Sequence, residues 1–131
     1  MATQQPLEMI LLRQLASYLA VPMWIMDSLG NLVYYNEPAE RLLGVSFDNV
    51  GPIDADDLVD TFRITDLDGE ALDQAELPIV KSLVERVPAH LTFRFCGMDG
   101  VWRKVAVSAL PIEGQGDRFL GAFATFWEAG D

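Results

Sequence analysis

The chain has 131 residues, half of them hydrophobic, with one cysteine and one histidine. This length suits one domain with one core, and the single cysteine excludes an internal disulfide and a zinc site built from cysteine and histidine alone. The formal net charge is -11, so the surface repels nucleic acid and anionic membranes, and we expect no binding to either.

We expect no export signal at the start of the chain. Residues 1–6 are uncharged and polar, and no positively charged start precedes an apolar core. No apolar run approaches the ~20 residues that span a bilayer. We therefore expect a cytoplasmic protein.

The first predicted element is a helix over residues 7–19. Its apolar side chains recur every three or four residues, which is helical spacing with a broad apolar face. One sheet covers only part of such a face, and we expect the rest to pair two copies of the chain. The predicted dimer interface consists of Leu7, Leu11, Leu12, Leu15, Ala16 and Leu19. This divides the chain into an N-terminal amphipathic dimerisation helix, residues 1–21, and a folded domain, residues 22–131.

A hairpin and a short helix are predicted next. Residues 23–26 and 32–35 favour strands, and residues 27–31 between them have turn chemistry. Asn36 is a good N-cap, Pro38 suits a first helical turn, and Gly44 marks a C-terminal stop.

The middle of the chain is less regular. Gly51-Pro52 and the acidic residues that follow favour a loop with one helical turn near Leu58, and residues 62–65 are either extended or helical. Apolar spacing then predicts a helix over residues 76–87, closed by Pro88. Alternation with a period of two predicts three strands in the remaining sequence. The residues that share one phase are Leu91, Phe93 and Phe95; Val101, Val105, Val107 and Ala109; and Phe119, Gly121, Phe123 and Thr125.

These features in this order resemble a PAS domain. The landmarks are Asp27, Gly30, Tyr35-Asn36, Pro38-Ala39-Glu40, Leu42-Leu43-Gly44, Asp68-Gly69-Glu70, Glu76-Leu77-Pro78-Ile79, Phe93-Arg94-Phe95, Asp99-Gly100, the run 105–111 and the run 121–126. The resemblance implies an α+β fold with a five-stranded antiparallel sheet in order 2-1-5-4-3 and helices on one face. It also implies sensing and pairing in signal transduction rather than catalysis.

The end of the chain departs from the family pattern. Similar domains commonly close with Asp, an apolar residue and Thr before a signalling helix, whereas this chain has Trp127-Glu128-Ala129-Gly130-Asp131. Two interpretations stay open. The chain is either the input fragment of a histidine kinase, diguanylate cyclase or transcriptional regulator, or a free-standing PAS protein that acts on a signalling partner.

The resemblance also bears on cofactors. Flavin-binding members share a Gly-Arg-Asn-Cys run that is missing here, and Phe123 falls where they carry a glutamine. Haem-binding members place a histidine on the helix before the third strand, but residues 76–87 contain none, and His90 is expected at an exposed or edge position. Cys96 is expected to be a small hydrophobe. We expect no cofactor, with a flavin or haem sensor as the alternative.

Without a flavin or haem site, the family pattern implies an apolar pocket between the sheet and the helices. Its expected lining is Phe93, Phe95, Val105, Val107, Ala109, Gly121, Phe123 and Thr125. Either these side chains fill the core at ordinary packing density, or they surround a fatty acid or another apolar small molecule. Gly121 and Ala109 are the positions at which small size leaves room.

Metal and catalytic sites find no support in the sequence. The acidic groups 54–60 and 66–73 lack the pattern of a calcium loop, and we expect solvated carboxylates there. Ser82 and Ser108 have no histidine at a suggestive place in the sequence, and the Gly-x-Ser-x-Gly pattern is absent. We expect no enzymatic activity.

Overall fold

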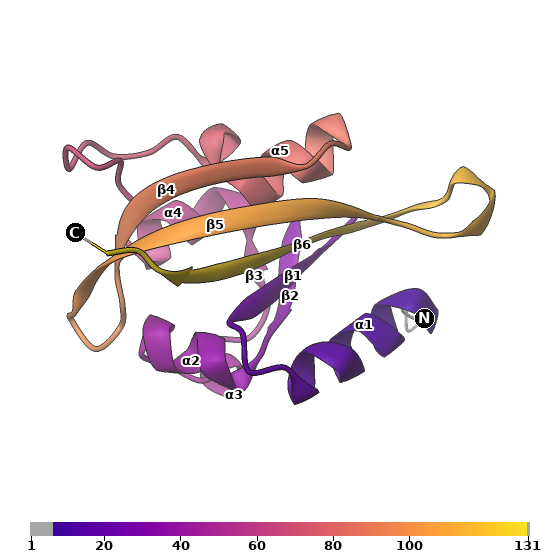
Figure 1. Ribbon diagram of the computed structural model, residues 1–131, viewed down its shortest axis with the longest axis horizontal. Coiled ribbons are helices and arrows are strands. Elements are labelled where there is room, and N and C mark those ends of the chain that lie inside the picture. The colour runs from indigo at the N-terminus through magenta and orange to yellow at the C-terminus, as the bar shows by residue number, and fades with distance from the viewer. Residues whose placement is uncertain (1–6, 131) are drawn as a thin grey trace.

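Six antiparallel strands form one sheet in the order β3-β2-β1-β6-β5-β4 (Figure 1). The computed structural model describes residues 7–130. The strands are β1 (Met23–Asp27), β2 (Asn31–Tyr35), β3 (Ile53–Asp54), β4 (Ala89–Cys96), β5 (Trp102–Glu113) and β6 (Phe119–Glu128). The helices are α1 (Leu7–Tyr18), α2 (Glu37–Leu43), α3 (Phe47–Val50), α4 (Ala55–Thr61) and α5 (Pro78–Glu85).

The predicted α+β architecture is confirmed, with one strand more than expected. The extra strand, β3, has two residues and pairs with β2 through Asn31↔Asp54 and Leu32↔Ile53. Without it, the strand order is the expected 2-1-5-4-3. Of the predicted N-terminal segment, residues 1–6 lie outside the described residues.

Local signals place the hairpin and α2 where the sequence predicts them. The Asp27 carboxylate accepts hydrogen bonds from the backbone N–H groups of Leu29 and Asn31, which closes the turn between β1 and β2. Asn36 caps α2, and Gly44 ends it in the left-handed region at φ 76°.

The acidic segment after Gly51-Pro52 forms a full helix, which corrects the prediction of a loop with one turn near Leu58. Asp54 caps α4 by accepting a hydrogen bond from the Asp56 N–H, and two residues of the helix, Leu58 and Val59, are buried against the core. The helix is therefore seven residues long, because its cap and its buried residues stabilise more turns than the sequence pattern alone predicts.

Helix α5 is shorter than the predicted range 76–87. A 3-10 turn, Gln74–Glu76, precedes it, and Leu77 is its N-cap residue. It ends because Arg86 adopts the left-handed region at φ 58°. The Ser82 hydroxyl then donates a hydrogen bond to the Val87 carbonyl and satisfies the backbone past the last turn.

The two faces of the sheet carry separate apolar clusters. Helices α2, α3, α4 and α5 contribute to the main core together with one face of the strands. Helix α1 packs on the opposite face, and Figure 1 shows it apart from the other helices. The smaller cluster consists of Met9, Ala16, Met23, Ile25, Ile112 and Leu120, with Leu12, Leu19, Val33, Tyr34 and Phe123 packed against it.

From Gly121 onward, the inward phase of β6 is the reverse of the predicted one, and an irregularity in the pairing with β5 precedes this part of the strand. Ala122, Ala124 and Phe126 face the main core, while Phe123 packs in the α1 cluster opposite Ile25. Gly121 and Thr125 share the phase of Phe123 and do not face the main core. Because β6 has apolar residues at both phases, its period-two pattern does not identify the buried face.

Candidate functional site

The candidate site is the space between the sheet and the helices of the main core. Its volume is about 10 Å³. Its wall consists of Trp24, Leu43, Phe62, Ile64, Phe93, Phe95, Val105, Val107 and Phe126. A drug-sized ligand needs roughly 300–1,000 Å³, so the side chains fill this core in the state described here.

Four of the eight predicted ligand residues lie in this wall: Phe93, Phe95, Val105 and Val107. Ala109 is fully buried in the same core without lining the cavity. Gly121, Phe123 and Thr125 belong to the other face of β6, so the prediction that they face the main core was wrong.

Sequence reasoning missed five wall residues. Trp24 and Phe126 come from the central strands β1 and β6, and their rings pack against each other with centroids 5.2 Å apart. Leu43, Phe62 and Ile64 come from α2 and from the chain after α4. The aromatic residues in predicted strands were the available signal, whereas Phe62 and Ile64 lie in the segment with no clear period.

Gly121 is small because the backbones of β6 and β1 pass close to each other, and it does not line a pocket. Its φ is 145°, and a Cβ atom at this position would collide with the carbonyl oxygen of Met26. The small size of residue 121 therefore lets β6 pass the backbone of β1. It leaves no room for a ligand, which corrects the role predicted from the sequence.

Trp24 has a buried side-chain nitrogen that makes no hydrogen bond. The residue is 4% exposed. Among residues 7–130, its indole Nε1 is the one fully buried side-chain nitrogen or oxygen without a hydrogen-bond partner. A buried tryptophan N–H normally has an acceptor, because leaving it unpaired costs about 1–3 kcal/mol.

Asn36 shows how completely another buried polar side chain is satisfied. Its Oδ1 accepts hydrogen bonds from the N–H groups of Met23 at 3.0 Å and Ala39 at 3.2 Å. Its Nδ2 donates to the carbonyls of Ala16 and Val21, both at 2.9 Å. One side chain thus joins the end of α1, the start of β1 and the first turn of α2.

Tyr35 is likewise satisfied. Its hydroxyl donates a 2.8 Å hydrogen bond to the Val45 carbonyl. Burial raises the pKa of Tyr35 well above its ordinary value, and the nearby Glu40 carboxylate raises it further. The phenol therefore stays neutral and serves as a structural donor.

The second candidate site is the outer face of α1. Leu7, Ile10, Leu11, Leu15 and Tyr18 are exposed, and Tyr18 is 78% exposed. Met9 and Ala16 are buried, and Leu12 and Leu19 pack beside them on the sheet. Of the predicted interface residues, Ala16 is buried against the domain's own sheet, and Leu12 and Leu19 are partly buried there. Leu7, Leu11 and Leu15 remain uncovered.

Helix α1 is fastened to the domain along its length. Near its start, the Glu8 carboxylate accepts two hydrogen bonds from Arg118 Nη2, at 3.0 and 2.9 Å. In its middle, the Arg13 guanidinium lies 4.8 Å from the centre of the Tyr34 ring. Since these contacts fix the inner face, the exposed side chains are presented in one defined row.

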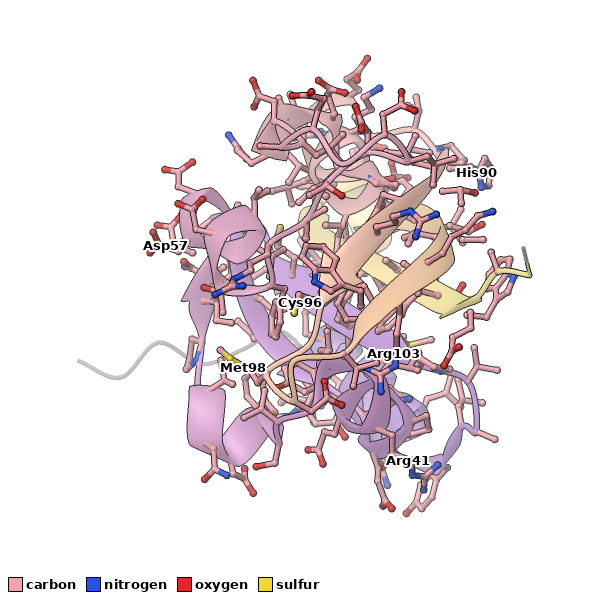
Figure 2. All side chains as sticks on the ribbon, turned by 90° about the vertical axis from the view of Figure 1, so that its left-hand side faces the viewer. Arg41, Asp57, His90, Cys96, Met98 and Arg103 are labelled. Carbon is pink, nitrogen blue, oxygen red and sulfur yellow. The ribbon has the colours of Figure 1, made fainter. Side chains whose placement is uncertain are left out.

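Arg103 joins three elements at the other end of the molecule, and Figure 2 shows it near the β4–β5 turn. Its Nη1 donates a 2.7 Å hydrogen bond to the Leu42 carbonyl in α2, and its Nε lies 3.8 Å from the Glu128 carboxylate in β6. Its hydrogen bond to the Asp99 carboxylate holds the pKa of Asp99 below its ordinary value. The Arg103 guanidinium therefore has a structural role: it links α2, the β4–β5 turn and β6.

His90 and Cys96 lie near opposite ends of β4, and neither lines the core cavity (Figure 2). Cys96 is buried, as expected for a small hydrophobe. His90 is exposed, and its Nδ1 lies 2.9 Å from Ser108 Oγ. Sequence analysis placed no histidine near Ser108; the two residues meet because they are directly opposite in the β4–β5 ladder.

Among residues 7–130, no three His, Cys, Asp or Glu side chains are grouped in a way that could hold a metal ion. None of the helices described has both the length and the apolar character needed to cross a membrane.

Comparisons with known proteins agree on one family. A family model described as a PAS domain matches residues 10–86. No curated protein matches the chain. Three solved structures illustrate the likeness of fold.

The PAS domain of a protein from Colwellia psychrerythraea has a TM-score of 0.66 at 15% identity, with 92% of this chain and 96% of that chain covered. The PAS domain of nitrogen regulation protein NR(II) from Vibrio parahaemolyticus has a TM-score of 0.63 at 20% identity, with 91% and 98% covered. The LOV protein of Rhodobacter sphaeroides has a TM-score of 0.73 at 16% identity, with 94% and 68% covered.

Proposed function

The chain belongs to the family of PAS domains, which are sensory modules of signal transduction, and on this premise we propose that it pairs with a second copy of itself through the outer face of α1. In this proposal the protein is a cytoplasmic interaction module with no catalytic role. A signalling partner responds to a change in the conformation or the pairing of this module.

The observation that carries the proposal is the exposed apolar row on α1. Leu7, Leu11 and Leu15 follow one another at intervals of four residues, and each is more than half exposed, at 66%, 53% and 53%. Ile10 and Tyr18 widen this row. Apolar patches of this kind mark interaction sites on otherwise polar surfaces. A second copy presents the same row, which makes a two-fold symmetric interface self-complementary.

The filled core supports an interaction role over the capture of a large cofactor. With about 10 Å³ of space, the main core has no room for a flavin ring or a haem in the state described. Nor does any histidine lie in its wall. This geometry therefore does not support the alternative function, a flavin or haem sensor.

Two arrangements of output fit the proposal. The output unit is either a histidine kinase, diguanylate cyclase or transcriptional regulator in the same polypeptide, or a separate signalling protein. The length of the complete gene distinguishes them. In both cases α1 remains the pairing element.

Replacing two leucines of the outer row is expected to abolish pairing. Leu11→Asp combined with Leu15→Asp places two carboxylates in the proposed interface, where burying unpaired charge is strongly unfavourable. We expect sedimentation velocity to show a dimer for the original protein and a monomer for the variant. Because both side chains are exposed in the domain itself, the far-UV circular dichroism spectrum is expected to stay unchanged.

Val84→Asp is the matched control. Val84 is a 72% exposed apolar residue on α5, outside the proposed interface. This variant should sediment like the original protein. If the original protein is already monomeric at high micromolar concentration, or if Val84→Asp disrupts pairing as strongly, α1 is not the pairing surface.

A further inference from the structure

We propose that the part of the outer sheet face left open by α1 is a docking surface for an acidic segment of a signalling partner. Two tryptophans, Trp102 and Trp127, and two basic residues, Arg94 and Lys104, make up this surface, which we call the tryptophan face. The inference rests on the proposed role as an interaction module, but not on pairing through α1. It defines the chemistry of the partner.

The register of the strands brings these four residues together around Lys104. Arg94 is directly opposite Lys104 in the β4–β5 ladder. Trp102 comes two residues before Lys104 on the same side of β5, and Trp127 is opposite Ala106, diagonal to Lys104. Side chains at opposite and diagonal positions on one face of a sheet are within reach of each other. The four residues therefore form one continuous patch.

The patch is open to a partner. Val105, Val107 and Phe126 point to the main core, so the patch lies on the other face of the same strands. In Figure 1, α1 lies toward the β5–β6 turn, whereas Trp102 and Trp127 are at the opposite ends of β5 and β6. They are 49% and 48% exposed. Each indole thus offers a large apolar area, and tryptophan is enriched at protein interfaces.

The charges of the patch are unusual for this chain. Arg94 and Lys104 are like charges at directly opposite positions, an arrangement that destabilises a sheet. Among the described residues, neither forms an ion pair with a carboxylate. The chain has 20 acidic and 9 basic residues, yet the outward positions of residues 90–96, 102–110 and 125–127 include no Asp or Glu.

An acidic protein segment with large apolar side chains suits both features of the tryptophan face. Its carboxylates neutralise Arg94 and Lys104, and its apolar side chains cover the two indole rings. Complementary charge of this kind gives an interface its specificity. Nucleic acid suits the face less well, because it carries a negative charge at every phosphate and the net charge of -11 repels it.

The test is a titration of ¹⁵N-labelled protein with the end-blocked peptide Glu-Glu-Phe-Glu-Glu-Leu-Glu-Glu. The chain has three tryptophans, and Trp102→Phe and Trp127→Phe assign the three indole N–H resonances. The resonances of Trp102 and Trp127 should move, whereas that of the buried Trp24 should stay in place. A peptide with Gln at every Glu should bind about tenfold more weakly, because it forms no ion pairs.

Lys104→Glu tests the charge of the face, and Lys81→Glu is its matched control. The new carboxylate at residue 104 lies opposite Arg94 and neutralises it, so the acidic peptide should bind at least about tenfold more weakly. Lys81 is exposed on α5, which packs on the other face of the sheet. Lys81→Glu should therefore change the affinity by less than about twofold at physiological salt. Both variants should keep the circular dichroism spectrum of the original protein.

The proposal is overturned if neither exposed indole resonance moves at millimolar peptide, if the Glu and Gln peptides bind equally, or if Lys81→Glu weakens binding as much as Lys104→Glu. Single-stranded oligothymidylate is the competing polyanion, and tighter binding of it than of the acidic peptide also contradicts the proposal.

Sedimentation separates this test from pairing through α1. The variant Leu11→Asp plus Leu15→Asp should bind the acidic peptide as the original protein does, whether or not its pairing is lost. Lys104→Glu should leave pairing unchanged. Loss of pairing in Lys104→Glu would show that a second copy covers the tryptophan face, and the proposal of an acidic partner segment would then be wrong.

Discussion

Phe93→Ala is expected to lower the free energy of unfolding by about 3–5 kcal/mol, the usual cost of truncating a fully buried phenylalanine. Phe93 is 2% exposed and lies in the main core between the sheet and its helices. Truncation enlarges the existing cavity, and β4 is too well paired with β5 to collapse into it. Urea unfolding followed by circular dichroism should show a much lower midpoint with an unchanged m-value.

The neighbouring residue Arg94 provides the control. Its side chain points to the opposite side of β4 and is exposed. Arg94→Ala should change the free energy of unfolding by less than about 0.5 kcal/mol. Lys104→Ala, on the same outward phase of β5, should behave alike. Equal midpoints for Phe93→Ala and these variants would show that the face assignment of β4 is incorrect.

Gly121→Ala is expected to destabilise the protein by about 3 kcal/mol or more. A residue with a side chain is strained at φ 145°, and its Cβ atom would also collide with the Met26 carbonyl oxygen. Backbone strain of this kind costs on the order of 1–3 kcal/mol. The collision adds to this cost because β1 and β6 are neighbours in the middle of the sheet. Urea unfolding again measures the loss.

Gly69→Ala separates the two causes. Gly69 also has a positive φ, 89°, but no atom outside Gly69 and its two chain neighbours would lie within 4 Å of an added Cβ. Its substitution should cost about 1–2 kcal/mol, from backbone strain alone. A loss at Gly121 no larger than the loss at Gly69 would mean that the collision is relieved by a small shift of β1.

The parts of the fold that were predictable from sequence are those with local causes. The turn at Asp27, the cap at Asn36 and the stop at Gly44 each act within a few residues, and the structure has all three. Helix α4 was missed because its signal is weak on its own. It is seven residues long, and burial of Leu58 and Val59 stabilises it only once the sheet is present.

The candidate site was predicted in part, for a related reason. Alternation with the family resemblance correctly placed the inward residues of β4 and β5, including Phe93 and Val107, because polar residues mark the outer phase of these strands. Strand β6 lies between β1 and β5 and packs on both faces, so apolar residues occupy both phases. Which face belongs to the main core depends on its neighbours, and a single sequence does not contain that information.

The same limit applies to α1. Its apolar residues surround much of the helix, and spacing alone does not tell which of them the sheet covers. The structure buries Met9 and Ala16 and leaves Leu11 and Leu15 in solvent. The pairing proposal therefore depends on a division of the helix surface that only the packed domain reveals.

The four hydrogen bonds of Asn36 have a mechanical consequence. Helices α1 and α2 pack on opposite faces of the sheet, yet both are anchored to this one amide. If α2 is displaced, the change reaches the last turn of α1 through the Asn36 amide rather than through the strands of the sheet. A disturbance beside Leu43 thus has a short route, through the side-chain hydrogen bonds of Asn36, to the helix that carries the exposed leucines.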